Sequence, residues 1–243
     1  MQQKSHGIVL HALKYGDNSL IVKIFTRDFG LKTFMVRGFR GKKSAFSASL
    51  FLPLTLIRLD MDSKKTSSAF NTLKDAQCYE PMHSLQTDFG KQAITLFIAE
   101  ILYKTIVDDE PHADLFEFIE HVLKYINSES TVPAVFPHFF LVNYSRFLGL
   151  YPNEYSDEST TYFNLRDGVF GRDKNLHSDF MSEEESEALK LILRADDNSL
   201  KDVKISKTQR NNLLVGLLNY YKIHLLNFRE IKSHNILAEV MRG

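Results

Sequence analysis

The first 80 residues alternate between apolar and polar positions with the period of β-strands. Their apolar runs are rich in β-branched and aromatic residues, which favour a pleated backbone. Turn sequences at 15–18 and 28–30 separate the first runs. The pattern predicts five strands, over residues 8–13, 20–26, 31–36, 50–59 and 67–78. Five short strands with short connections favour a small antiparallel barrel of the OB-fold type, although an SH3-like barrel fits the pattern nearly as well.

From about residue 82 the apolar positions recur with the period of a helix. Proline at the start of a helix and glycine at its end mark the boundaries, as does a serine followed three residues later by Glu or Gln. The predicted helices cover about 89–104, Pro111 to 123, Pro133 to a cap at Gly149, a segment after Ser182, a segment after Ser206, and 231–240.

Residues 151–181 interrupt the helical period with proline, glycine, aspartate and serine. We expect an irregular insertion here, with a short hairpin around 162–170. The predicted fold class is therefore α+β. An amino-terminal five-stranded OB-fold barrel, residues 1–80, precedes a carboxy-terminal helical domain, residues 81–243, that carries the insertion.

The formal net charge of zero conceals an uneven distribution. Residues 1–80 hold 13 basic and 6 acidic side chains, a net charge of +7, and the remainder holds 17 basic and 24 acidic ones, a net charge of −7. Such asymmetry indicates an anion-binding module joined to a second part of different role, although a chance imbalance on a solvated face gives the same numbers.

The segment after the third predicted strand concentrates this positive charge. It is not a nucleotide-binding loop, because only two residues separate Gly38 from Gly41 and such a loop needs four. Its cations can neutralise phosphates and its aromatic residue can stack on unpaired bases. The predicted nucleic-acid contacts are Arg37, Phe39, Arg40, Lys42 and Lys43, followed in rank by Lys64 and Lys65 between the last two strands. A plain solvated loop and an exposed hairpin tip remain as the alternatives. Of the flanking aromatics, Phe34 is expected in the core.

Other function classes find little support in the sequence. A single cysteine, Cys78, excludes an internal disulfide and a multi-cysteine zinc site. The acidic run 108–110 precedes Pro111 and favours a helix amino terminus rather than a metal site. No metal-binding histidine pair or nucleophile elbow occurs, so we expect no catalysis and no cofactor. Without a signal peptide or a membrane-length apolar run, the protein is expected to be soluble and cytoplasmic.

Three groups of motifs resemble, in order, those of one known family. The first group is His6-Gly7-Ile8-Val9-Leu10, Tyr15-Gly16-Asp17-Asn18-Ser19, Phe25-Thr26 to Gly30, and Arg37-Gly38-Phe39-Arg40 to Ser44. The second is Phe147-Leu148-Gly149-Leu150 with Pro152, and the third is Tyr220 to His224, Lys232-Ser233 and Leu237. Together they are similar to the RecO family of recombination mediators over nearly the whole chain.

This resemblance implies an OB-fold that binds single- and double-stranded DNA, anneals complementary strands and helps to load recombinase onto coated single strands. It also implies two partners, RecR and the acidic carboxy-terminal tail of the single-strand-binding protein. Many family members hold zinc with paired cysteines after the leucine-glycine motif. This chain has Asn153-Glu154-Tyr155 there instead, so zinc is not expected. Aromatic packing is expected to hold the insertion, through Tyr155, Tyr162, Phe163 and Phe170.

A tail that ends in an apolar residue with a free carboxylate needs an apolar pocket beside cations. The candidate cations for this dock are Arg146, Lys207 and Arg210. Two other functions fit the residues: an RNA-binding OB-fold protein, and an adaptor that binds proteins without binding nucleic acid.

Overall fold

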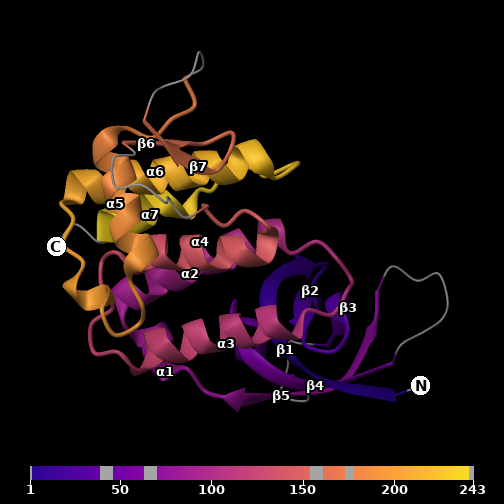
Figure 1. The fold of residues 1–243 in the computed structure, drawn as a ribbon. Coiled ribbons are helices and arrows are strands. Elements are labelled where there is room, and N and C mark those ends of the chain that lie inside the picture. Colours follow the sequence, from indigo (N-terminus) through magenta and orange to yellow (C-terminus); the bar gives the residue numbers. More distant parts are fainter. Residues whose placement is uncertain (1, 39–45, 63–69, 154–160, 173–177, 241–243) are drawn as a thin grey trace. The chain divides into compact units, whose positions relative to one another are not determined.

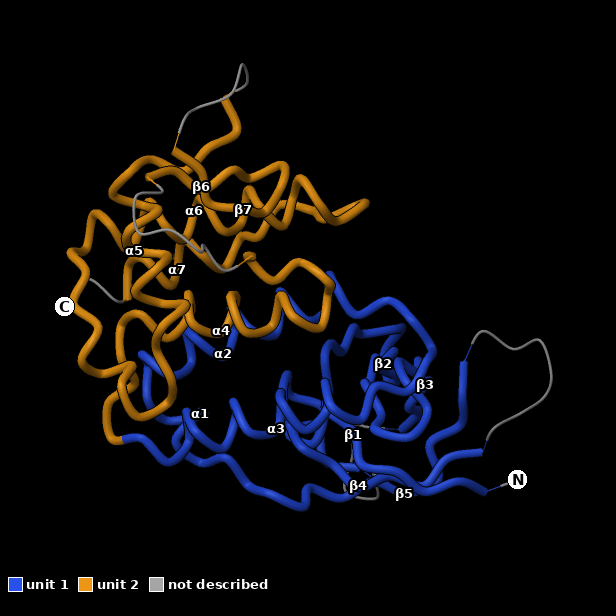
Figure 2. The backbone as a smooth tube through the Cα atoms, viewed as in Figure 1, with its two compact units in different colours: residues 1–129 blue, residues 130–243 orange. Residues whose placement is uncertain are grey.

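The computed structural model describes residues 2–38, 46–62, 70–153, 161–172 and 178–240 (Figure 1). The chain forms two compact units, Met1–Glu129 (unit 1) and Ser130–Gly243 (unit 2), which Figure 2 shows in separate colours. The predicted domain boundary near residue 80 stays a prediction; the three helices that follow the sheet belong to the same compact unit as the sheet.

Unit 1 begins with a five-stranded antiparallel sheet in the order β3-β2-β1-β4-β5. The strands are β1 (Gln2–Tyr15), β2 (Ser19–Thr26), β3 (Gly30–Arg37), β4 (Leu56–Asp62) and β5 (Thr72–Glu80). The α+β class and the five antiparallel strands are confirmed, and the sheet is OB-like.

The fourth strand starts later than predicted. Residues 50–59 were expected to be extended, but Ala48–Phe51 form a 3-10 helix, η1, because the Ser47 side chain accepts a hydrogen bond from the Ser49 amide. Leu54 then adopts a left-handed conformation with φ of 61°, and its amide donates to the Val9 carbonyl at 2.6 Å. The strand begins only after this turn, at Leu56.

The two edges of the sheet meet at one point. The Asn71 amide donates to the Thr33 carbonyl at 2.8 Å, and the Asn71 side-chain amide donates to the same oxygen at 3.2 Å. This contact is a single parallel bridge between Phe34 and Asn71. Because the described residues show no longer ladder between β3 and β5, the sheet is OB-like with its closure limited to this bridge.

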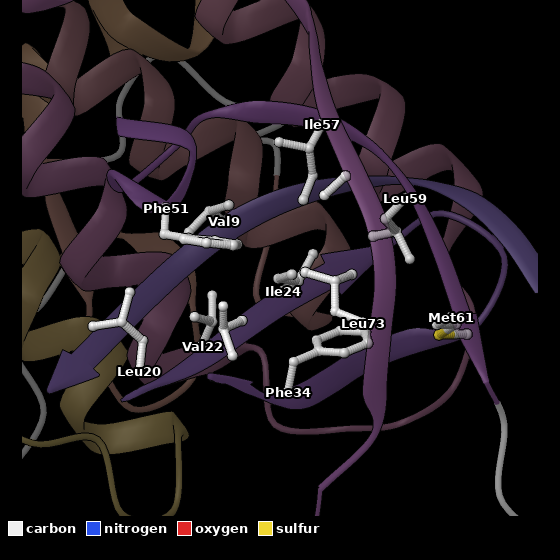
Figure 3. Packing of buried hydrophobic residues seen from close by; sticks show 12 residues of the cluster. Val9, Leu20, Val22, Ile24, Phe34, Phe51, Ile57, Leu59, Met61 and Leu73 are labelled. Atoms are coloured by element: carbon white, nitrogen blue, oxygen red, sulfur yellow. The ribbon is translucent and has the colours of Figure 1, made fainter. Parts of the chain in front are cut away.

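The inner face of the sheet forms the core of the OB-like part. Figure 3 shows the side chains converging between the strands: Val9, Leu20, Val22, Ile24, Phe34, Phe51, Ile57, Leu59, Met61 and Leu73. Phe34 is fully buried, which confirms its predicted place in the core. Gly7 faces the same interior; a Cβ there would lie 2.6 Å from Ile24 Cγ2, so only glycine fits without a shift.

Three helices complete unit 1: α1 (His83–Thr87), α2 (Phe89–Thr105) and α3 (Ala113–Ser128). The α3 helix begins two residues after the predicted start at Pro111. The acidic run before it binds the start of β3: the Leu31 amide donates to the Asp108 carbonyl at 3.1 Å, and Lys32 Nζ lies 3.5 Å from Asp109 Oδ2.

Unit 2 contains five further helical elements of four residues or more and a small hairpin within the described ranges. They are α4 (Phe136–Tyr144), η2 (Ser145–Leu148), β6 (Tyr162–Asn164), β7 (Val169–Gly171), α5 (Glu183–Arg194), α6 (Lys207–His224) and α7 (Ser233–Val240), with a three-residue η3 (Leu200–Asp202) between α5 and α6. Both predicted capping boxes are present, at Ser182 and Ser206, and Gly149 ends η2 in the predicted left-handed conformation, with φ of 69°.

The hairpin in the insertion packs through aromatic rings, as predicted. Phe163 is fully buried, and its ring centroid lies 5.0 Å from that of Phe170 and 5.3 Å from that of Tyr220 on α6. Tyr162 is half-buried, whereas Tyr155 lies outside the described residues.

Candidate nucleic-acid interface

The structure places Arg37, of the predicted DNA contacts, at the end of β3. The others lie outside the described residues: Phe39, Arg40, Lys42, Lys43, Lys64 and Lys65. Arg37 is exposed and pairs in register with Ser19 on β2. Gly38 turns the chain away with φ of 70°, and its amide donates to the Asn18 carbonyl at 2.7 Å. Arg37 therefore stands at the point where β3 meets the β1–β2 turn.

Arg37 differs from several other cations of unit 1 because no described acidic side chain pairs with it. Lys4 pairs with Asp60 at 3.8 Å, and Lys74 pairs with Asp62 at 3.2 Å. On the helical side, Arg27 pairs with Glu117 and Lys32 with Asp109. The Arg37 guanidinium remains available for an external anion.

A cavity of about 460 Å³ opens beside Arg37 at the junction of β3 and β5. It is lined by Met35, Val36, Arg37, Phe46, Phe70, Asn71, Thr72 and Leu73. Two phenylalanines, a methionine and a guanidinium at one opening offer both apolar surface and positive charge, the combination that single-stranded nucleic acids bind.

Each of the two predicted DNA-binding segments is followed in the chain by a residue that lines this cavity. Phe46 and Phe70, which line it, are the first described residues after segments 39–45 and 63–69. The sequence alone did not suggest Met35, Phe70 or Asn71, because their proximity depends on the bridge between the sheet edges. Phe46 itself is half-buried, with its ring edge-on to Phe51 at 5.9 Å, so it also anchors the returning chain on the core.

The three candidate cations for the tail dock lie on unit 2. The Arg146 guanidinium stacks 4.0 Å from the Tyr151 ring centroid and donates to the Tyr151 hydroxyl at 2.8 Å. Arg210 Nη1 donates to the Ile205 carbonyl at 3.2 Å, and Lys207 is the exposed first residue of α6. Two of the three cations thus already have partners within unit 2.

A different cavity of unit 2, of about 320 Å³, combines apolar walls with cations. It lies where α6 meets the segment before α7, and it is lined by Val215, Leu218, Asn219, Lys222, Phe228, Arg229, Glu230, Ile231 and His234. None of the three predicted cations lines this cavity.

His138 on α4 is a buried histidine with a structural role. Its Nε2 donates to the Arg210 carbonyl at 2.7 Å, which leaves Nδ1 unprotonated and without a described hydrogen-bond partner. Burial lowers the pKa of the His138 imidazole to about 4, so the ring is neutral at pH 7.

The residues present do not fit a zinc site built from paired cysteines. The single cysteine, Cys78, lies on β5 in unit 1, and the described residues contain no cluster of three or more His, Cys, Asp or Glu side chains that could hold a metal. The described ranges also include no helix of the length and hydropathy that a bilayer requires.

Comparison with known proteins identifies the family. The pattern described as "Recombination protein O N terminal" matches residues 1–82, and "Recombination protein O C terminal" matches residues 86–233. The chain is 34% identical over 240 residues to "DNA repair protein RecO" of Phocaeicola vulgatus, covering 99% of both chains. It is 34% identical over 234 residues to the protein of that name from Christiangramia forsetii, covering 96% of both. The chain therefore belongs to the RecO family, whose members act in DNA repair as recombination mediators and not as enzymes.

Proposed function

We propose that this protein binds single- and double-stranded DNA at the β3–β5 end of the sheet, anneals complementary strands, and helps to load recombinase onto coated single strands together with RecR. The observation that carries the proposal is the cavity beside Arg37, a residue that pairs with no described acidic side chain. Segments 39–45 and 63–69, which adjoin the lining residues in the chain, contain five further cations. Membership of the RecO family supports it.

Annealing by such a site requires no bond-making residue. Two complementary strands repel each other through their phosphates, and a basic surface that neutralises both backbones lowers that repulsion. Base pairing then supplies the free energy. The protein contributes only local positive charge and a surface that keeps the bases unpaired until they meet.

The test measures how DNA affinity depends on salt. The triple variant Arg40→Ala, Lys42→Ala, Lys43→Ala should anneal strands more slowly, and its slope of log K against log salt should fall by about 2, because each phosphate contact on a single strand contributes about 0.7. The control triple Lys124→Ala, Lys201→Ala, Lys204→Ala removes the same charge elsewhere and should keep the slope. Equal slopes for wild type and the first triple would place the DNA site elsewhere.

Competition between DNA and RNA strands of one sequence separates this function from an RNA-binding one. Preference for RNA would overturn the assignment to DNA. Binding of acidic peptides in the absence of any oligonucleotide affinity would instead indicate an adaptor.

The proposed function includes a dock for the acidic tail of the single-strand-binding protein on unit 2. The predicted cations Arg146, Lys207 and Arg210 define one site. The cavity with Lys222 and Arg229 has the required apolar walls and defines another. A labelled tail peptide should lose affinity for one set of alanine variants and keep it for the other. If both sets bind the peptide as wild type does, neither site is the dock.

A further inference from the structure

The outer face of β1, β2 and β3 carries an apolar strip that the sequence pattern did not reveal. Residues directly opposite one another in an antiparallel sheet share a face. The register places Tyr15 opposite Ser19 and Leu13 opposite Ile21. On the other side of β2, Met35 lies opposite Ile21. We call Leu13, Tyr15, Ile21 and Met35 the outer strip.

The outer strip lies on the surface of unit 1. Leu13 and Tyr15 each retain 56% of their accessible surface, and Ile21 and Met35 are half-buried. The alternate positions of β2, Leu20 and Val22, point the other way into the core, so the strip is not part of the interior. Adjoining apolar and aromatic side chains on a strand surface form a platform on which planar groups can stack.

At each end of the strip stands a cation that pairs with no acidic side chain among the described residues. Arg37 shares the row of Tyr15 and Ser19 at one end. Lys23 lies opposite both His11 and Thr33 at the other. The two rows lie four positions apart on β2, at Ser19 and Lys23, which is about 13 Å at the rise of a β-strand.

The Lys23 end is held in place by an aromatic ring. Lys23 Nζ lies 5.1 Å from the centroid of the Tyr103 ring on α2, and the His11 ring stacks on the same tyrosine at 4.4 Å. The described residues offer no acidic partner to Lys23. The ring therefore positions this ammonium without neutralising its charge, and a phosphate can bind it.

These features fit one class of ligand. An apolar platform with a tyrosine, whose described rows hold cations at both ends and no acidic residue, matches a strand whose bases are exposed and whose phosphates run alongside. A duplex presents phosphates but hides the faces of its bases. The strip would therefore recognise single strands, whereas cations alone would bind both forms.

We propose that the outer strip stacks the unpaired bases of a single DNA strand, with Tyr15 as the stacking residue and Arg37 and Lys23 as the phosphate contacts at its two ends. This inference rests on the proposed function, since it extends the interface at Arg37 across the outer face of the sheet. It assigns the ability to distinguish single strands from duplexes to particular side chains.

The chain contains no tryptophan, which allows a direct test. Tyr15→Trp introduces a sole tryptophan whose fluorescence stacked bases should quench. Phe89→Trp is the control: Phe89 is 81% exposed at the start of α2, about 20 Å along the helix from Tyr103. A titration with a labelled, unstructured DNA strand reports binding by anisotropy and stacking by tryptophan quenching at the same time.

The expected result is that both variants bind the strand and that only the tryptophan at position 15 is quenched. Binding without quenching at position 15 would overturn the stacking inference and leave the proposed function intact. Absence of binding by the wild-type protein at low salt would overturn the proposed function itself.

Affinity measurements on a second pair of variants give an independent check. Tyr15→Ala should weaken single-strand binding about tenfold and leave duplex binding unchanged, because only unpaired bases stack. Tyr15→Phe keeps the ring and should bind both forms as wild type does. Equal loss of single-strand and duplex affinity in Tyr15→Ala would contradict stacking at this position.

Discussion

Gly30 fixes the β2–β3 turn against the chain that precedes α3. Its φ is +67°, and a Cβ there would lie 2.4 Å from both the Asp109 carbonyl carbon and the Glu110 carbonyl oxygen. The Thr26 hydroxyl closes the turn by donating to the Gly30 carbonyl at 2.7 Å. The glycine of the motif at 25–30 is thus required both by backbone conformation and by close packing.

Replacing Gly30 should therefore cost more than its left-handed conformation alone explains. Gly16 has nearly the same φ, +66°, but nothing within 4 Å of its Cβ position, so Gly16→Ala should lose only about 1 kcal/mol of unfolding free energy. Gly30→Ala adds backbone overlap and should lose about 3 kcal/mol. Denaturant unfolding of both variants measures the difference, and equal losses would mean that the turn can move away from Asp109.

The buried His138 predicts how stability depends on pH. Its folded-state pKa of about 4 lies below the unfolded value of 6.5, so the unfolded chain binds the proton first as pH falls. The contribution of neutral His138 is complete above pH 6.5 and is lost as pH falls toward 4, by about 3 kcal/mol at most.

The variant His138→Gln isolates this effect. Glutamine keeps a donor for the Arg210 carbonyl but does not titrate in this range. Unfolding free energies measured at pH 7, 5.5 and 4 should fall more steeply for the wild type than for the variant. Parallel curves would show that another group governs the acid sensitivity.

At the scale of elements, the carboxy-terminal end of α3 depends on a buried lysine of α2. Lys91 Nζ donates to the Glu129 carbonyl at 2.6 Å and to the Asn127 carbonyl at 3.4 Å, and also to the Ser84 hydroxyl at 3.0 Å. A cation at this position satisfies carbonyls that the helix leaves unpaired and complements the negative end of its dipole.

Lys91→Met should destabilise unit 1 by about 1–3 kcal/mol, because buried carbonyls lose a charged donor. Lys124→Met is the matched control: its ammonium pairs with Glu120 one turn away at the surface of α3, a pair that contributes less than about 0.5 kcal/mol. Thermal unfolding of the two variants measures the difference in stability. If Lys91→Met lost no more stability than Lys124→Met, Lys91 would not stabilise the end of α3.

The elements that the sequence predicted well are those with local signals. The helices after Ser182 and Ser206 begin where their capping boxes lie, because a cap depends only on residues three positions apart. The predicted start of β4 was wrong because an apolar run such as 50–59 is compatible both with a strand and with a 3-10 helix followed by a turn. Arg37 could be predicted as a DNA contact from its charge alone. The outer strip could not be predicted, because its residues are neighbours only in the register of three strands.

At the scale of the whole molecule, the charge asymmetry lies within unit 1. Residues 81–129 hold 9 acidic and 3 basic side chains, whereas unit 2 holds 15 acidic and 14 basic ones. The acidic excess that the sequence places after residue 80 therefore belongs mostly to the compact unit that contains the basic sheet. The field of that unit favours DNA at the sheet and opposes it at the helices.

Removing negative charge from this acidic segment should therefore strengthen DNA binding. The double variant Glu110→Gln, Asp114→Asn should bind a single strand about threefold more tightly at low salt, and the gain should vanish at high salt because screening suppresses long-range repulsion. The control Glu183→Gln, Glu184→Gln on unit 2 changes net charge equally. An equal gain in DNA affinity in the control variant would show that the affinity depends on the net charge of the protein and not on where the charges lie.

The position of Lys91 also has a mechanical consequence. The carbonyl that its ammonium holds most closely belongs to Glu129, the last residue of unit 1, so tension along the backbone from unit 2 arrives at a charged, buried anchor. A force applied at the carboxy terminus would reach unit 1 at Glu129, the residue whose carbonyl the Lys91 ammonium binds. The sheet to which we assign DNA binding precedes this anchor in the chain, so the contact at Glu129 separates it from any strain that arises in unit 2.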